Sequence, residues 1–88
     1  MTNTMKAVSQ DEVGGPEVLA VTTLRRPEPG MGEILVRVHV AGVNPADVMS
    51  RQLGLFVGQP PFVLGWDVSG VVEAVGPGVT IHQPGDEV

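Results

Sequence analysis

The residue types that most often do chemistry are scarce in this chain of 88 residues. It contains no cysteine, which excludes disulfides and any thiolate zinc site within these residues. Neither histidine has a second residue at the spacing of a metal site or a catalytic triad. His39 falls on the same expected strand face as Arg37, and His82 lies beside a turn. We therefore expect both imidazoles to be in solvent.

The segment Asn44-Pro45-Ala46-Asp47 has two interpretations. Asn44 can cap a helix, and Pro45 suits the first helical position. Asp47, at the third position, is placed to accept the backbone N–H of Asn44 in a reciprocal cap. The Asn44 carboxamide could instead orient a polar ligand. The two roles are compatible if the backbone carries one and the amide tip the other. Asp47 is interpreted as structural.

The single tryptophan, Trp66, is either a large core residue or part of a pocket wall. Asp67 follows it, but no Cys or His stands beside it, so a metal role is not expected. Residues 51–62 are spaced by glycines and carry Leu55, Phe56 and Phe62. This segment is either a mobile flap over a substrate or a plain surface loop.

The elements that must position these residues are short. Glycine and proline, 12 and 8 residues, fall in clusters between apolar runs, which is typical of short strands joined by tight turns. The pattern predicts strands over residues 5–9, 18–24, 33–42 and 66–75, a helix that begins after Asn44 and ends at Gly54, and a loop over residues 54–61.

Two of these elements carry a predicted inner face. In residues 33–42 a period of two places Ile34, Val36, Val38 and Val40 on one side of the strand. In the helix we expect Val48 and Leu53 to face inward.

Composition indicates one small soluble domain with five basic against ten acidic residues, a balance that argues against a nucleic-acid surface. No apolar run approaches the roughly 20 residues that span a bilayer. Residues 1–6 lack a signal-peptide pattern, and we expect a cytoplasmic protein. Because Glu87-Val88 reads as the start of a strand, residues 1–88 are interpreted as a partial domain, incomplete at the C-terminus.

Four blocks in order resemble one family, and together they extend over nearly the whole chain from Lys6. They are residues 5–8 with 14–19, residues 29–38, residues 41–47, and residues 65–72 with 75–76 and 84–88. These blocks are similar to the chaperonin-10-like (GroES-like) catalytic domain of the medium-chain dehydrogenase/reductases, with the first block closest to the quinone oxidoreductases. The resemblance implies a mainly β fold, a partial GroES-like β-barrel with one short helix.

Two departures from the family pattern select a branch. In the zinc-dependent alcohol dehydrogenases that the chain resembles, a Cys ligand stands at the place of Asn44 and a His ligand at the place of Trp66. Asn is a poor zinc ligand, and the indole N–H of Trp can only donate. The resemblance therefore implies the zinc-independent branch and no metal.

That branch reduces quinones or activated double bonds with hydride from NADPH. The resemblance implies that Asn44, the catalytic residue, and Pro45 lie beside the nicotinamide, and that Met49, Phe56 and Trp66 line the substrate pocket. The 88 residues contain no Gly-x-Gly-x-x-Gly, so the Rossmann domain that holds the cofactor is not among them. We expect the isolated segment to be inactive and the full-length protein to be a homodimer acting on a small molecule, away from membranes and nucleic acid.

Met49 stands at about the place where a tyrosine often follows in the quinone oxidoreductases, and the chain has no tyrosine. A tyrosine proton donor therefore cannot come from these residues. Two enzyme alternatives stay open, a zinc-type alcohol dehydrogenase that keeps ligands elsewhere and an enoyl reductase. A third alternative is a binding or scaffold module on the same fold without redox chemistry.

Overall fold

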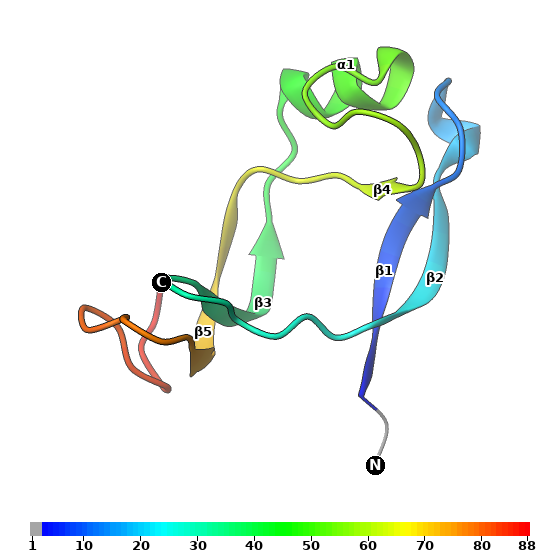
Figure 1. Ribbon diagram of the computed structural model, residues 1–88. Helices are drawn as coiled ribbons and strands as arrows, with labels where there is room; N and C mark the ends of the chain where they lie inside the picture. Colours follow the sequence, from blue (N-terminus) through cyan, green and yellow to red (C-terminus); the bar gives the residue numbers. More distant parts are fainter. Residues whose placement is uncertain (1–2) are drawn as a thin grey trace. The chain divides into compact units, whose positions relative to one another are not determined.

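The computed structural model describes residues 3–88 and has five strands, one α-helix and one 3-10 turn in that range (Figure 1). The elements are β1 (Thr4–Gln10), η1 (Pro16–Val18), β2 (Ala20–Arg25), β3 (Ile34–Ala41), α1 (Pro45–Leu53), β4 (Phe62–Val63) and β5 (Val68–Val75). The prediction of a mainly β fold with one short helix is confirmed. The residues form two compact units, 3–26 with 43–66 and 27–42 with 67–88.

The first unit is built on a three-stranded antiparallel sheet in the order β2-β1-β4. β1 pairs with β2 from Thr4↔Arg25 to Ser9↔Ala20. The second predicted strand begins later than expected, because residues 16–18 form the turn η1. Pro16 starts that turn, and the Leu19 N–H donates to its carbonyl at 3.1 Å.

Helix α1 has the predicted ends. Asn44 is its N-cap, Pro45 is its first residue, and Gly54 ends it in the left-handed region at φ 74°. Its predicted inner face is wrong, since Val48 is 37% exposed and Leu53 is 66% exposed.

Polar contacts fix the inner side of α1 instead. The Gly14 N–H and the buried Gln10 Nε2 donate to the Arg51 carbonyl at 3.0 and 3.1 Å. The Arg51 Nε–H returns a bond to the Gly14 carbonyl at 3.1 Å. The residues that α1 buries are accordingly polar, Asp47 and Ser50. A hydrophobic period could not reveal this side of the helix.

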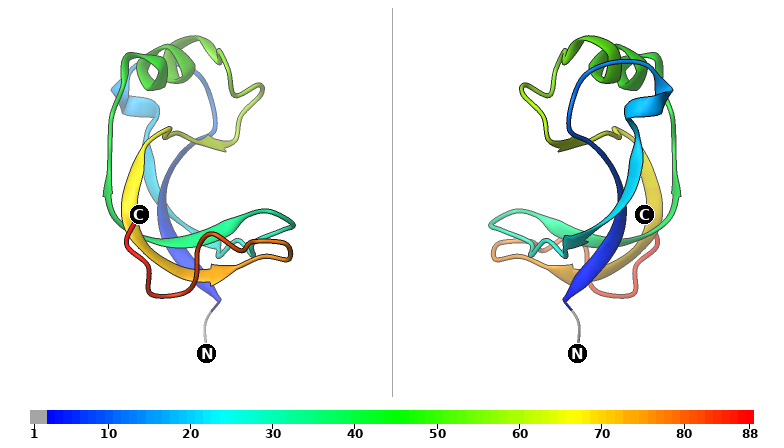
Figure 2. Two further views of the ribbon diagram at one scale, coloured as in Figure 1. Left: turned by 90° about the vertical axis from the view of Figure 1, so that its left-hand side faces the viewer. Right: turned by 90° about the vertical axis from the view of Figure 1, so that its right-hand side faces the viewer.

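The second unit is a two-stranded antiparallel sheet of β3 and β5, with the C-terminal segment beside β5 (Figure 2). Two irregularities in register, at Leu35/Val36 and between Val38 and Val40, interrupt the predicted alternation of faces in β3. Burial follows position along the strand and not its period, because only the first three residues are partly buried. Gly70 and Val88 exchange two backbone hydrogen bonds of 3.0 and 2.9 Å.

Close backbone approach explains two of the glycines in this unit. A Cβ on Gly76 would collide with the Gly30 carbonyl, and one on Gly70 would collide with the Arg37 carbonyl. The Gly76 N–H donates to the Glu33 carbonyl at 2.8 Å across the same approach. The lack of a side chain at Gly70 and Gly76 therefore permits these close backbone contacts.

The apolar core is small. Among the described residues, Val72 at 1% exposure is the one fully buried hydrophobic side chain, and many Val, Leu and Met side chains are exposed. No helix within residues 3–88 is long and apolar enough to cross a membrane. Met1 and Thr2, part of the stretch without a signal-peptide pattern, lie outside the described residues.

Candidate functional site

Asn44 and Asp47 form the capping box predicted at the start of α1. The Asp47 Oδ2 accepts the Asn44 backbone N–H at 2.7 Å, and the Asp47 backbone N–H donates to the Asn44 carbonyl at 2.9 Å. Asn44 has an extended backbone at φ −126° and ψ 161° and is half-buried. The capping role predicted for both residues is thus observed. It fixes the backbone position from which the Asn44 side chain extends.

The loop after α1 is tied back to the helix by one buried side chain. Ser50 is fully buried, and its Oγ–H donates to the Leu55 carbonyl at 2.6 Å. The Gly54 N–H donates to the Ser50 carbonyl at 2.9 Å. The first residues after α1, in the segment interpreted as either a flap or a surface loop, are therefore anchored to the helix that Asn44 caps.

Phe56 and Trp66 meet at the two ends of this loop region. Their ring centroids are 6.2 Å apart and the planes lie at 86°, an edge-to-face contact. Phe56 adopts φ 72°, a left-handed conformation that is strained for a bulky side chain. The structure therefore brings together two of the three residues predicted to line the substrate pocket.

These two rings are largely in solvent. Trp66 is 51% exposed and Phe56 is 68% exposed, so Trp66 is not part of the core that these 88 residues form. Met49, the third predicted pocket residue, is exposed on α1, and no ring or polar contact ties it to the aromatic pair in the described part of the chain. Pro45 is exposed at the first position of α1.

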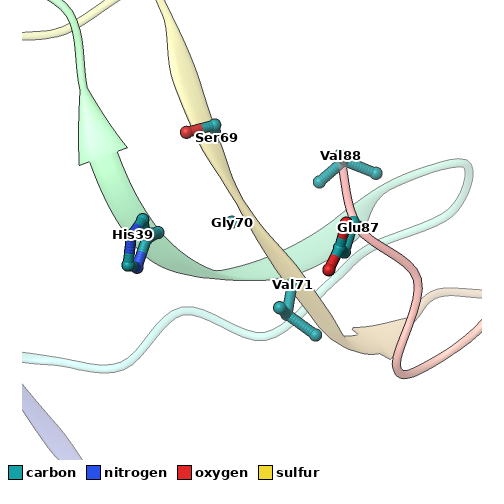
Figure 3. A pocket seen from close by; sticks show the side chains of 6 residues that line it. All are labelled: His39, Ser69, Gly70, Val71, Glu87 and Val88. Carbon is teal, nitrogen blue, oxygen red and sulfur yellow. The ribbon is translucent and has the colours of Figure 1, made fainter.

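A separate pocket of about 350 Å³ lies in the second unit, beside β5 (Figure 3). It is lined by His39, Ser69, Gly70, Val71, Glu87 and Val88. Figure 3 shows His39 on β3 and Glu87 on the C-terminal segment, with β5 between them. Within residues 3–88 no hydrogen bond joins its His, Ser and Glu side chains, so the pocket holds no catalytic triad. His39 is exposed, as predicted.

Acidic and imidazole side chains do not gather at one point. Within residues 3–88, no group of three or more His, Cys, Asp or Glu side chains is arranged to hold a metal ion. Asp67 is exposed directly after Trp66, and its carbonyl accepts the Gly42 N–H at 3.0 Å.

Sequence reasoning missed the burial of three polar residues in the first unit, Gln10, Asp47 and Ser50. Gln10 is buried at the end of β1, where its Nε2 donates to the Glu12 and Arg51 carbonyls. Asp47 was expected as a cap, but its burial was not expected. The signal for Asp47 was its place three residues after a cap residue. Nothing in the sequence pairs Gln10 with Arg51, because that contact spans 41 positions.

Comparison with known proteins gives one family match and several relatives. The family model for the alcohol dehydrogenase GroES-like domain matches residues 30–88. The quinone oxidoreductase of Rattus norvegicus is 39% identical over 87 residues, which cover 96% of this chain and 26% of that protein. A zinc-type alcohol dehydrogenase-like protein of Staphylococcus aureus is 50% identical over 64 residues, which cover 73% of this chain and 18% of that protein.

Solved structures of oxidoreductases are also similar to this chain. A mycobacterial quinone oxidoreductase superposes with a TM-score of 0.86 at 42% identity, covering 94% of this chain and 26% of that one. A cobalt- and zinc-bound thermostable alcohol dehydrogenase from Pyrobaculum aerophilum gives 0.86 at 39% identity, covering 97% and 26%. A mycobacterial protein complexed with NADPH gives 0.87 at 42%, covering 94% and 26%. The chain therefore spans about a quarter of the length of these solved structures.

Proposed function

The chain belongs to the alcohol dehydrogenase GroES-like domain family, and from that premise we propose that it is the N-terminal catalytic-domain segment of an NADPH-dependent oxidoreductase that transfers hydride to a quinone or an activated double bond without a catalytic zinc. Oxidoreductases are its relatives in both comparisons. The finer choice of acceptor and cofactor is supported by the similarity to quinone oxidoreductases and to a structure that holds NADPH.

The residues at the resembling metal positions do not fit zinc. A catalytic zinc takes three protein ligands, from His, Cys or carboxylate, and leaves one position open. Trp66 offers only an indole N–H, which donates and cannot bind a cation through its nitrogen. Asn44 carries a neutral carboxamide at the capped start of α1. The proposal of a zinc-free reaction rests on these two side chains, Asn44 and Trp66. The proposed hydride transfer uses no metal ion.

The aromatic pair suits a planar ring. Phe56 and Trp66 expose apolar ring surface, and a nicotinamide or quinone ring would cover it and exclude water from the reacting atoms. NADPH, when bound, supplies the hydride. In this proposal its pyrophosphate is bound by residues other than these 88.

Asn44 supplies the polar contact in this proposal. Its backbone is fixed by Asp47, so its carboxamide projects from a defined point and orients the ring that accepts or gives the hydride. Pro45 stiffens the next position, and Met49 one turn further along α1 adds an adaptable apolar contact.

The test is NADPH titration into the full-length protein, followed by absorbance at the nicotinamide band with a panel of quinones and enones. We expect oxidation of NADPH that a chelator leaves unchanged. Loss of activity with a chelator, restored by zinc, would favour the second candidate, a zinc-type alcohol dehydrogenase. The similarity to the Staphylococcus aureus protein supports that candidate. Failure to bind and to turn over NADPH would favour a scaffold module.

A further inference from the structure

Three carboxylates within residues 3–88 make the same local bond. Each accepts the backbone N–H of the residue three positions earlier: Asp47 Oδ2 from Asn44 at 2.7 Å, Glu33 Oε1 from Gly30 at 2.8 Å, and Asp86 Oδ2 from Gln83 at 3.0 Å. The bonds of Glu33 and Asp86 are exposed. Asp47 differs, because only 7% of it is exposed.

Burial leaves the second oxygen of Asp47 in an unfavourable place. Asp47 Oδ1 is buried and has no hydrogen-bond partner among the described residues. A buried acceptor without a donor costs free energy that an exposed one recovers from water. Capping alone does not require this arrangement, since Glu33 and Asp86 make the same bond with access to solvent.

What the buried position adds is control over Asn44. The Asp47 carboxylate accepts the Asn44 N–H, and the Asp47 N–H donates to the Asn44 carbonyl. Asp47 sits on the first turn of α1 and cannot swing into solvent as an exposed cap can. Two hydrogen bonds to the same residue, Asp47, therefore restrain the Asn44 backbone on both sides of its Cα.

We propose that Asp47 is a positioning residue of the reductase site and acts on the reaction through Asn44. This inference rests on the proposed function, in which the Asn44 carboxamide orients the reacting ring. Unsatisfied buried polar groups recur at sites where geometry matters more than local stability. Loss of the Asp47 carboxylate then frees the Asn44 backbone and misplaces its carboxamide.

The experiment is a double-mutant cycle in the full-length protein, with kcat and KM for NADPH-dependent quinone reduction. The variants are Asp47→Ala, Asn44→Ala and the double variant, each assayed at a temperature where its melting curve shows it folded. We expect Asp47→Ala to lower kcat by about tenfold or more, because small misplacements are costly in a positioned site. The double variant should lose no more than about twofold beyond Asn44→Ala, because the two residues act as one unit.

Two further variants separate positioning from folding. Asp47→Asn keeps an oxygen for the Asn44 N–H, and we expect it to recover kcat to within about threefold of the unmodified protein. Asp86→Ala breaks the same type of bond in the second unit, and kcat should stay within about twofold.

Additive losses in the double variant would overturn the positioning role. So would a kcat for Asp47→Ala close to that of the unmodified protein, or an Asp47→Asn as impaired as Asp47→Ala. If the unmodified protein shows no NADPH turnover, the proposed function itself fails. If the unmodified protein turns over and Asp47 has no effect, only the positioning role fails.

Discussion

Phe56 contacts Trp66 edge to face, with 6.2 Å between the ring centroids. The two residues are 10 positions apart in the chain, and both are more than half exposed. The loop between the two residues holds Phe56 in a left-handed conformation that a bulky residue rarely adopts. Two exposed rings held in contact at a strained position form the surface that we propose receives the ligand.

Replacing Trp66 should weaken substrate binding more than it weakens the fold. We expect Trp66→Ala in the full-length protein to raise KM for quinones about threefold to tenfold, the value of one aromatic contact of about 0.5–1.5 kcal/mol. Its melting temperature should fall little, because the side chain is half exposed. The matched control is Ile81→Ala, an exposed apolar side chain in the second unit. A similar rise in KM for that control would contradict a specific role for Trp66.

Adding one methyl group at Gly76 should destabilise the second unit strongly. A Cβ there would collide with the Gly30 carbonyl, a backbone atom that cannot rotate away. We expect Gly76→Ala to lower the free energy of unfolding by about 3 kcal/mol or more, measured by urea denaturation.

Gly42→Ala is the control for that substitution, since its Cβ would lie at an ordinary 3.4 Å from the Asp67 Cβ. It should change the free energy of unfolding by less than about 1 kcal/mol. Equal effects of the two substitutions would show that the close approach of Gly76 and Gly30 is not a constraint.

Removing the Ser50 hydroxyl should loosen the loop that carries Phe56. Ser50→Ala removes the donor to the Leu55 carbonyl and leaves that carbonyl without its partner. The expected loss in free energy of unfolding is about 1–3 kcal/mol. Amide hydrogen exchange over residues 54–61 should become faster in the same variant.

Ser69→Ala, on the exposed surface of β5, is the matched control for Ser50. It should change neither the stability nor the exchange of the loop. Unchanged exchange in Ser50→Ala would mean that the loop is held by other contacts.

The sequence predicted what local chemistry decides. Asn44, Pro45 and Gly54 fix the ends of α1 through capping and backbone preference, and these ends were predicted correctly. Four of the five strands in the described residues were predicted from apolar runs between glycines and prolines, although the second begins after the turn at residues 16–18. The short strand β4 was not predicted.

Long-range contacts could not be predicted in the same way. Val48 and Leu53 were expected inside because α1 was assumed to bury its apolar side chains. Hydrogen bonds from Gln10 and Gly14 to Arg51 fix a polar side of the helix instead. The contact of Phe56 with Trp66 also depends on the path of a loop, which periodicity does not encode. Trp66 could therefore be placed at a family position, but its ring partner could not be predicted.

The most direct test of the account is the zinc content of the purified full-length protein, measured by elemental analysis on the same sample whose NADPH-dependent quinone reduction is assayed. We predict full turnover with far less than one zinc per chain, because Asn44 is a poor zinc ligand and Trp66 offers none at the resembling metal positions. One tightly bound zinc per chain, whose removal abolishes turnover and whose return restores it, would contradict the zinc-free mechanism.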